Sequence, residues 1–259
     1  MSTEIRFLGV AGFEIVGGGR RILIDPFLSA SPAAPVRHED LATPDVILVS
    51  HAAFDHLGDT AAIALRTGAP VVCGADVRIA LLAEGVPSEQ VRATVWGLVV
   101  ELDGLLIRPV ECHHWSMATL PDGSTVTGTP IAFIVEPEPG VRIYHYGDTA
   151  IFDMRWIGEL YRPTIGLIGC SQPRELLAGV PGPGRLVTGE LSPDEAGRVA
   201  EMLGVELAVA CHYLERNDDV DAFVAAVAQH DSTGTRRVAT PRVGEVVVVE
   251  PSPVAGSAA

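Results

Sequence analysis

The sequence has few of the features that mark nucleic-acid-binding, membrane-spanning or secreted proteins. It carries 18 basic residues against 33 acidic ones, a formal charge of −15. Because Lys and Arg displace counterions from phosphate backbones, this balance argues against a nucleic-acid partner. No apolar run reaches the roughly 18 residues that cross a bilayer, and the N-terminus lacks the stretches of a signal peptide. We therefore expect a cytoplasmic protein that binds neither nucleic acid nor membrane.

Cysteine is also scarce, and none of the four cysteines belongs to a CxxC pair. Each lies at the end of an apolar run, as in PVVC and IGLIGC. This placement predicts reduced, buried thiols at strand ends rather than disulfides. Cys112 and Cys211 each directly precede a histidine, which leaves open a second hypothesis that they lie beside a ligand.

What the chain does have is enough apolar residues for a large core: 47% of 259 residues are hydrophobic. Strand-like and helix-like stretches alternate in both halves, with no linker between them. This pattern predicts an α/β protein in which helices flank two packed sheets within a single domain of residues 1–250. Residues 251–259 are expected to form a disordered tail.

Several elements can be placed from local patterns. The apolar run at 45–50 (DVILVS) predicts a buried strand. Hairpins are expected to turn at Asp103-Gly104 and at Pro139-Gly140. The segment SPDE predicts a helix that begins after Ser192 through a capping box. Residues 115–129 and 171–190 are polar or rich in Gly and Pro, and are predicted to be loops.

The placement of the histidines indicates a metal site. Two carboxylates, Asp55 and Asp148, share the same strand-end pattern. Strand-end loops of layered α/β folds bring ligands together, and imidazoles with carboxylates bind Zn²⁺, Mn²⁺ and Fe²⁺. A single histidine is better explained as a strand cap or a buried hydrogen-bonding group, but the whole set is not. Six of the eight histidines lie at or just after predicted strands: His51, His56, His113, His114, His145 and His212.

These segments resemble the motifs of the metallo-β-lactamase superfamily. SHAAFDHLGD is similar to its HxHxDH signature, YHYGDT to its later Gly-Asp-Thr element, and ACHY to its last metal histidine. The opening FLGVAGFEIVGGGRRILIDPFL and the closing LSPDEAGRVAEMLGVELAVACHY resemble an ascorbate-phosphate-lactonase-like branch. The resemblance implies a four-layer αββα sandwich and a metal-dependent hydrolase.

The resemblance also implies roles for individual residues. It places a first metal on His51 and one of the His113–His114 pair, a second metal on Asp55, His56 and His212, and Asp148 as the bridge. His114 is preferred to His113 because H-W-S matches the family's third element better. Asp25 would support the ligands, although a turn carboxylate before Pro26 is an equal interpretation.

One residue departs from the family pattern. Ala53 stands where the family has its second histidine, and alanine cannot bind a metal. The second site is therefore predicted to be complete and the first to be weakened. Four explanations remain open: an enzyme with one metal, replacement of the ligand by His113, Cys112 or water, an engineered change, or loss of catalysis.

The expected function is hydrolysis of a small carbonyl substrate, a lactone, cyclic amide or similar compound, by water that a zinc or manganese ion activates. Asp55 is the favoured proton acceptor, with His145 as a weaker candidate. The alternatives are a phosphodiesterase for small phosphate esters and a non-catalytic binding protein. The 115–129 and 171–190 loops are expected to cover the site, where Arg174 or Arg185 would suit an anionic substrate. A homo-oligomer is also left open. The residues of interest in these loops are Trp115, Met117, Leu120, Gln172, Arg174 and Arg185.

Overall fold

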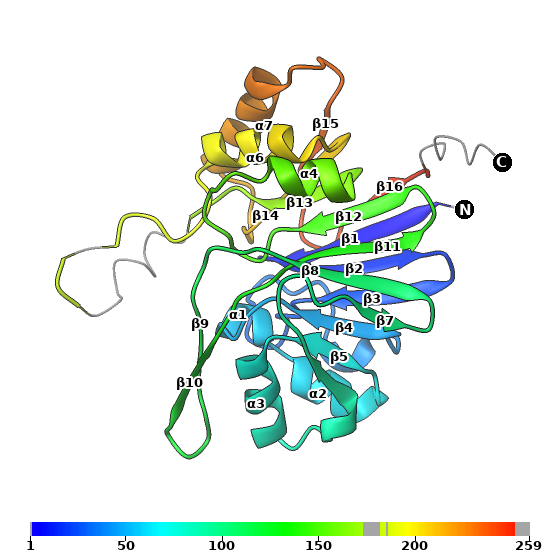
Figure 1. Ribbon diagram of the computed structural model, residues 1–259, viewed down its shortest axis with the longest axis vertical. Coiled ribbons are helices and arrows are strands. Elements are labelled where there is room, and N and C mark those ends of the chain that lie inside the picture. Colours follow the sequence, from blue (N-terminus) through cyan, green and yellow to red (C-terminus); the bar gives the residue numbers. More distant parts are fainter. Residues whose placement is uncertain (1, 173–181, 185, 252–259) are drawn as a thin grey trace.

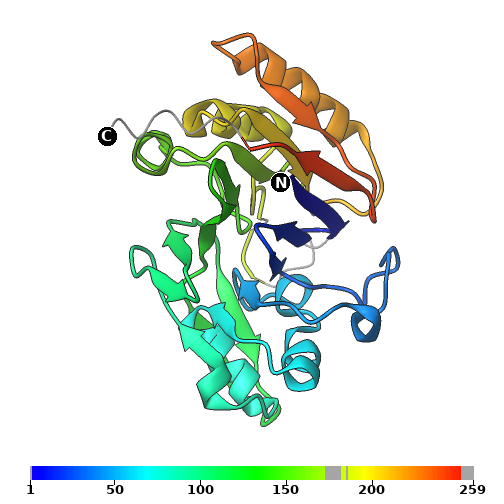
Figure 2. The ribbon, with the colours of Figure 1, turned by 90° about the vertical axis from the view of Figure 1, so that its right-hand side faces the viewer.

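The computed structural model describes residues 2–172, 182–184 and 186–251. Two seven-stranded sheets pack face to face, and helices cover the outer surface of each sheet (Figures 1 and 2). The predicted αββα arrangement is confirmed. Residues 252–259, the larger part of the predicted tail, lie outside the described residues.

The first sheet consists, in spatial order, of β16 (Val246–Val249), β1 (Thr3–Gly9), β2 (Gly12–Gly17), β3 (Arg20–Ile24), β4 (Val46–Val49), β5 (Val71–Cys73) and β6 (Val91–Ala93). The strands from β16 to β3 are antiparallel neighbours, and those from β3 to β6 are parallel. Parallel neighbours need crossover connections. The helices α2 (Thr60–Thr67) and α3 (Ala75–Ala83) lie in two of these crossovers and cover the outer face.

The second sheet consists of β15 (Arg237–Ala239), β14 (Leu207–Cys211), β13 (Ile165–Gly169), β12 (Val141–His145), β11 (Ala132–Glu138), β8 (Leu105–Val110) and β7 (Val100–Leu102). Its strands are parallel from β15 to β12 and antiparallel from β12 to β7. The outer face is covered by α4 (Arg155–Tyr161), α6 (Pro193–Leu203) and α7 (Asp218–His230), as Figure 1 shows. The described elements also include three short helical segments: η1 (His38–Asp40), α1 (Phe54–Leu57) and η2 (Ser88–Gln90).

The main core lies between the two sheets. Phe7 and Phe13 from the first sheet belong to the same fully buried cluster as Phe133 and Tyr144 from the second. Burial of one such side chain stabilises the fold by roughly 1.5–3 kcal/mol. A second cluster, which includes Ile47 of β4, fills the space between the first sheet and its helices. The main core cluster therefore holds the two sheets against each other.

The local patterns gave most elements correctly. β4 occupies the predicted strand at 45–50, and the two hairpins turn at Asp103-Gly104 and Pro139-Gly140. The capping box of α6 is present, because Ser192 Oγ accepts from the backbone N–H of Glu195 while the Glu195 carboxylate accepts from that of Ser192.

The prediction of a loop at 115–129 was wrong. Residues Ser116–Thr119 (β9) and Thr125–Gly128 (β10) pair as an antiparallel hairpin that extends beside α3 (Figure 1). The Asp122-Gly123 turn was read as loop composition, whereas Gly123, at φ +83°, closes a hairpin. The buried Ser116 side chain donates to Asp76 of α3 and so attaches this hairpin to the body of the protein.

The prediction of four buried thiols is confirmed, since Cys73, Cys112, Cys170 and Cys211 are all buried and free. Among the described residues, no helix has the length and apolar character needed to traverse a bilayer.

Candidate metal centre

Four buried polar side chains converge where strands of the two sheets end. His51 comes two residues after β4 and His56 lies in α1, while Asp148 follows β12 and His212 directly follows β14. The distance to Asp148 Oδ2 is 2.8 Å from His56 Nε2, 3.4 Å from His212 Nε2 and 3.9 Å from His51 Nε2. The structure thus brings together residues from positions 51 to 212 of the sequence.

The hydrogen bonding of this cluster fits a metal ion. Within the described part of the chain, the buried Nε2 atoms of His51, His56 and His212 make no hydrogen bond of acceptable geometry, and neither does Asp148 Oδ1. His56 Nε2 lies only 2.8 Å from Asp148 Oδ2, but the two groups are not aligned as donor and acceptor. A buried polar atom without a partner costs about 1–3 kcal/mol, so several in one place require an explanation. Three imidazole nitrogens and a carboxylate that face one another form a donor set for a divalent metal such as zinc.

Two of these histidines are held from behind by carboxylates. His56 Nδ1 lies 2.8 Å from Asp25 Oδ2, and His212 Nδ1 lies 2.9 Å from Glu190 Oε2. The carbonyl of Ser171 also lies 3.0 Å from His212 Nδ1. Asp25 is itself fixed, because the backbone N–H and the hydroxyl of Ser50 both donate to it. A carboxylate behind a ligand histidine orients the ring and makes its other nitrogen a better donor to metal. In both His56 and His212, Nδ1 faces a supporting carboxylate while Nε2 is left to bind a metal.

The charges of the cluster displace its pKa values in opposite directions. Burial disfavours charge on His56, yet the carboxylates of Asp148 and Asp25 raise its pKa well above the usual value. Burial also disfavours charge on His212, but the carboxylates of Glu190 and Asp148 outweigh this effect and raise its pKa well above the usual value. Burial together with the nearby His56 ring lowers the pKa of His51. The site therefore attracts positive charge at His56 and His212 more than at His51.

The two remaining carboxylic acids respond to the same field. Burial opposes ionisation of Asp148, but its neighbours His56 and His212 hold its pKa well below the usual range. Burial and the negative charge of Asp148 raise the pKa of Glu190 to about 7. Asp148 is thus the anionic centre of the cluster, and Glu190 is the group whose charge depends on what His212 carries.

Several site residues have an uncommon backbone conformation. Asp25, Asp148 and His212 have φ values of +44°, +66° and +68°, the left-handed region that non-glycine residues rarely occupy. Each such residue costs roughly 1–3 kcal/mol and persists only where the surrounding structure holds it. For His212, the backbone N–H donates to the carbonyl of Val10 at 2.6 Å. The turn between β1 and β2 therefore helps to hold a candidate ligand of the opposite sheet.

The other predicted ligands lie at the margin of this cluster. The half-buried Asp55 has a carboxylate oxygen within 4.8 Å of ring nitrogens of His56 and His212. His114 packs edge-on against His51 with ring centroids 4.9 Å apart, and its Nδ1 lies 2.9 Å from the carbonyl of Gly189. Ala53 begins α1 as its N-terminal cap residue and brings no ligand atom.

Two candidates do not contact the cluster. His113 is exposed, lies 2.7 Å from Glu111 Oε1 and stacks on Phe152, so it does not join the cluster. Cys112 donates its S–H to the carbonyl of Gly147, and burial raises its thiol pKa well above the usual value. Neither residue takes the place of the ligand missing at Ala53.

The prediction of His145 as a catalytic group is not supported by its position. Its ring is fully buried behind Asp25, with Nε2 3.9 Å from Asp25 Oδ2 and 2.8 Å from the Ala11 carbonyl. Burial lowers its pKa, which favours a neutral ring that donates to this carbonyl. His145 is a buried hydrogen-bonding residue beneath the site.

Glu190 is not among the site residues predicted from the sequence. It lies at the end of the Gly/Pro-rich segment 171–190, and the nearest recognisable pattern is the capping box that begins at Ser192. The hydroxyl of Tyr146 also donates to its carboxylate, at 3.3 Å. No local pattern identifies such a residue, because its contact with His212 arises from the packing of separate segments. Arg174 and Arg185, the predicted partners of an anionic substrate, lie outside the described residues.

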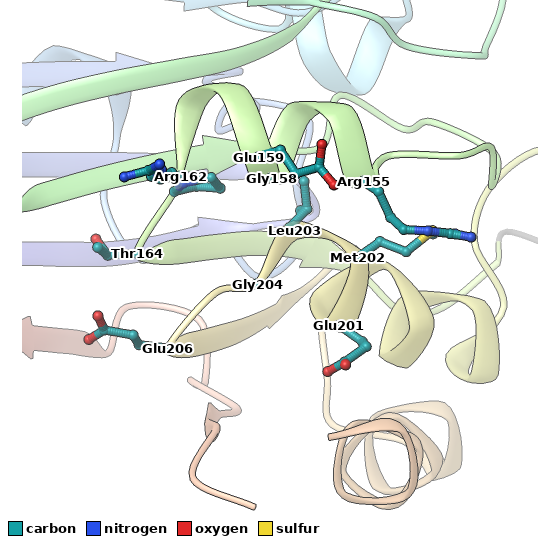
Figure 3. Close-up of a pocket in the computed structure, with 11 residues that line it drawn as sticks. Arg155, Gly158, Glu159, Arg162, Thr164, Glu201, Met202, Leu203, Gly204 and Glu206 are labelled. Carbon is teal, nitrogen blue, oxygen red and sulfur yellow. The ribbon is translucent and has the colours of Figure 1, made fainter. Parts of the chain in front are cut away.

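An open hollow of about 640 Å³ lies away from this cluster. It is bounded by α4, the end of α6 and the starts of β13 and β14, with Arg155, Arg162, Glu159 and Glu206 among its lining residues (Figure 3). None of the clustered histidines lines it. We place the functional centre at the histidines, where the unpartnered buried nitrogens lie.

Comparisons with known proteins show similarity to metal-dependent hydrolases. The family model for a beta-lactamase superfamily domain matches residues 20–213. The chain is 37% identical over 214 residues to a UPF0173 metal-dependent hydrolase of Rubrobacter xylanophilus, covering 82% of this chain and 81% of the relative. A UPF0173 metal-dependent hydrolase of Methanopyrus kandleri is 38% identical over 212 residues, which covers 81% and 84% of the two chains.

Solved structures show the same architecture. Igni18, a metallo hydrolase of Ignicoccus hospitalis, superposes with a TM-score of 0.73 at 24% identity, covering 96% of this chain and 99% of its own. The metallo-beta-lactamase fold protein YhfI of Bacillus subtilis gives a TM-score of 0.66 at 16% identity, with coverages of 95% and 99%. At these identities the likeness concerns the fold.

Proposed function

The chain belongs to the metal-dependent hydrolases of the metallo-β-lactamase superfamily, and from this premise we propose that it hydrolyses a small, neutral carbonyl compound such as a lactone or cyclic amide. The observation that carries the proposal is the set of three buried, unpartnered imidazole nitrogens around Asp148. Such a set matches an ion that polarises a carbonyl group and activates water.

The residues that would hold the ion are His56, His212 and Asp148, with His51 facing the same carboxylate. We favour zinc, which imidazole nitrogens bind well, and place manganese second. When bound, such an ion supplies Lewis-acid chemistry and lowers the pKa of water from 15.7 toward roughly 7. Asp25 and Glu190 would keep the rings of His56 and His212 in the orientation that this requires.

We assign proton transfer to Asp55. Its carboxylate lies close to His56 and His212 but, unlike them, is half-buried rather than buried. A carboxylate in this position can accept a proton inside the site and release it to solvent. The backbone of α1 fixes Asp55 one residue before His56, so the proton acceptor and a ligand share one short helix.

The charge of the site favours a carbonyl compound over a phosphate ester. Four carboxylates, those of Asp25, Asp55, Asp148 and Glu190, lie in or directly behind the cluster. Glu190 is only partly ionised near neutral pH, because its pKa is raised to about 7. Even so, a single divalent ion with neutral histidines adds no more positive charge than two of the other carboxylates balance. A phosphodiester would bring a further negative charge into this field, whereas a lactone or amide is neutral.

The test has two parts. The first is metal content per chain by inductively coupled plasma mass spectrometry, with the ion located by anomalous scattering. The second compares turnover of γ-butyrolactone and δ-valerolactam with that of bis(p-nitrophenyl) phosphate. We expect a bound zinc or manganese ion and turnover of a carbonyl compound. Turnover of the phosphate alone would replace the proposal with a phosphodiesterase. Absence of both metal and activity after addition of Zn²⁺ and Mn²⁺ would leave a binding protein.

A further inference from the structure

Three exposed apolar residues lie within two positions in the sequence of residues that form or contact the candidate metal centre: Phe54, Trp115 and Val187. We propose that these three residues form a subsite for an apolar chain or ring attached to the reacting carbonyl compound. The preferred substrate would then be a neutral lactone or ester with a hydrophobic substituent rather than a small polar one. The inference rests on the proposed function, because it concerns the same site.

Phe54 connects this group to the signature segment. It lies between Ala53 and Asp55 in the first turn of α1, and 64% of its surface is exposed. Its ring packs edge-on against Phe27, with centroids 5.7 Å apart and an interplanar angle of 82°. Phe27 therefore supports the ring, most of which stays open to solvent, and Phe54 immediately precedes the proposed proton acceptor in the chain.

Trp115 occupies the corresponding position on the second segment. It follows His114, with ring centroids 5.5 Å apart, and is 48% exposed. The two segments are in direct contact, because the backbone N–H of Ala52 donates to Ser116 Oγ at 3.0 Å. Phe54 and Trp115 thus lie two residues and one residue, respectively, from the ends of this hydrogen bond.

Val187 comes from the third segment. It is 68% exposed and precedes Gly189, whose carbonyl lies 2.9 Å from His114 Nδ1. Each of the three segments that meet at the site therefore exposes an apolar side chain within two residues of a group that contacts the site. A scattered exposed apolar residue needs no explanation, but a group of them around a polar centre is typical of ligand-binding sites.

The chemistry of this group complements that of the cluster. Carboxylates dominate the cluster, whereas the three apolar side chains carry no charge. A ligand that places a neutral carbonyl at the histidines and an apolar substituent against Phe54 and Trp115 would satisfy both. Each methylene buried there raises affinity by up to about fourfold.

The test uses a homologous series of γ-lactones, γ-butyrolactone, γ-hexalactone and γ-nonalactone, with the metal-loaded protein. We expect kcat/KM to rise by up to about fourfold for each added methylene. The variants Phe54→Ser and Trp115→Ala should flatten this dependence while γ-butyrolactone turnover changes little. Leu160→Ser is the matched control, since Leu160 is 66% exposed but lies on α4 in the outer helical layer.

A second series separates this inference from the proposed function. The 3-alkylcyclopentanones have the shape of the lactones but contain no bond to hydrolyse, and calorimetry measures their binding. Chain-dependent binding that Phe54→Ser and Trp115→Ala abolish, without lactone turnover, would support the subsite and overturn the proposed reaction. Lactone turnover with no dependence on chain length, or with the same dependence in both variants, would overturn the subsite and leave the reaction intact.

Discussion

The two sides of the metal centre differ in what stands behind their imidazole rings. On the side that we call the His56 side, His56 and His212 each have a buried carboxylate behind the ring, Asp25 and Glu190. On the opposite side, the Ala53 side, the partners among the described residues are neutral: the hydroxyl of Ser50 for His51 and the carbonyl of Gly189 for His114. The difference concerns the supporting groups as much as the ligands themselves.

The electrostatics follow the same division. On the Ala53 side, burial lowers the pKa of both His51 and His114. On the His56 side the neighbouring carboxylates outweigh burial, and both pKa values are raised. Negative charge is thus concentrated where His56 and His212 lie, which is where a cation would be most stable. The replacement of a ligand by Ala53 falls on the side that is already the poorer cation site.

The largest expected effect tests which side holds the metal. The His212→Ala variant removes a nitrogen donor from the His56 side and leaves Glu190 buried without its partner. We expect metal affinity to fall by more than the roughly 10- to 100-fold that loss of a supporting residue causes. Metal content after dialysis measures the effect, with His230→Ala as the control because His230, at the end of α7, pairs with Asp194 of α6 in the outer helical layer. Full metal content in the His212→Ala protein would contradict the assignment.

The change of metal affinity with pH also distinguishes the two sides, because their histidines have pKa values shifted in opposite directions. A metal must displace protons from His56 and His212, whose pKa values are raised above 6.5 in the metal-free protein. Affinity should therefore increase as the pH rises above 6.5, by up to about tenfold per pH unit for each proton displaced, until the raised pKa values are passed. His51 and His114 have lowered pKa values and are already neutral there. Calorimetry in buffers of different ionisation enthalpy counts the released protons; affinity independent of pH would indicate binding on the Ala53 side.

Removing the charge of a supporting carboxylate should lower metal affinity less than removing a ligand. Glu190→Gln keeps the size of the side chain but removes the charge that orients His212. We expect metal affinity to fall by about 10- to 100-fold while the metal stays at its original position. Glu159→Gln, an exposed residue on α4, is the control. If Glu190→Gln binds metal as tightly as the unchanged protein, the carboxylate behind His212 has no supporting role.

The sequence alone indicated the clustered histidines better than the carboxylates behind them. Strand-end histidines stand out because the strands are apolar and β-branched, so a polar residue directly after DVILVS or ELAVAC marks an edge of the sheet. The αββα arrangement followed from the same alternation and from the resemblance to the superfamily. His114 was preferred to His113 by motif, and the structure places only His114 against His51.

The supports were not predictable because they depend on packing between distant segments. Glu190 reaches His212 only through the arrangement of the segment before α6 against the end of β14. His145 shows the converse: it follows the strand-end pattern, yet its buried ring lies 3.9 Å from Asp25 and outside the cluster of candidate ligands. Spacing in the sequence identifies the end of a strand, but not which of two layers a side chain at that end will join.

The smallest expected effect comes from restoring the missing ligand. Ala53→His places an imidazole on the Ala53 side, at the start of α1, and should leave affinity at the His56 side nearly unchanged. It should raise the metal content from one toward two ions per chain at high metal concentration, with the second ion bound more weakly because no carboxylate supports His51 or His114. Ala53→Gln, with a comparable side chain that is a poor ligand, controls for bulk at this position. A stoichiometry that stays at one would mean that the missing histidine is not what limits the Ala53 side. A stoichiometry of two in the unaltered protein would mean that the two sides are equivalent despite the difference in their supporting groups.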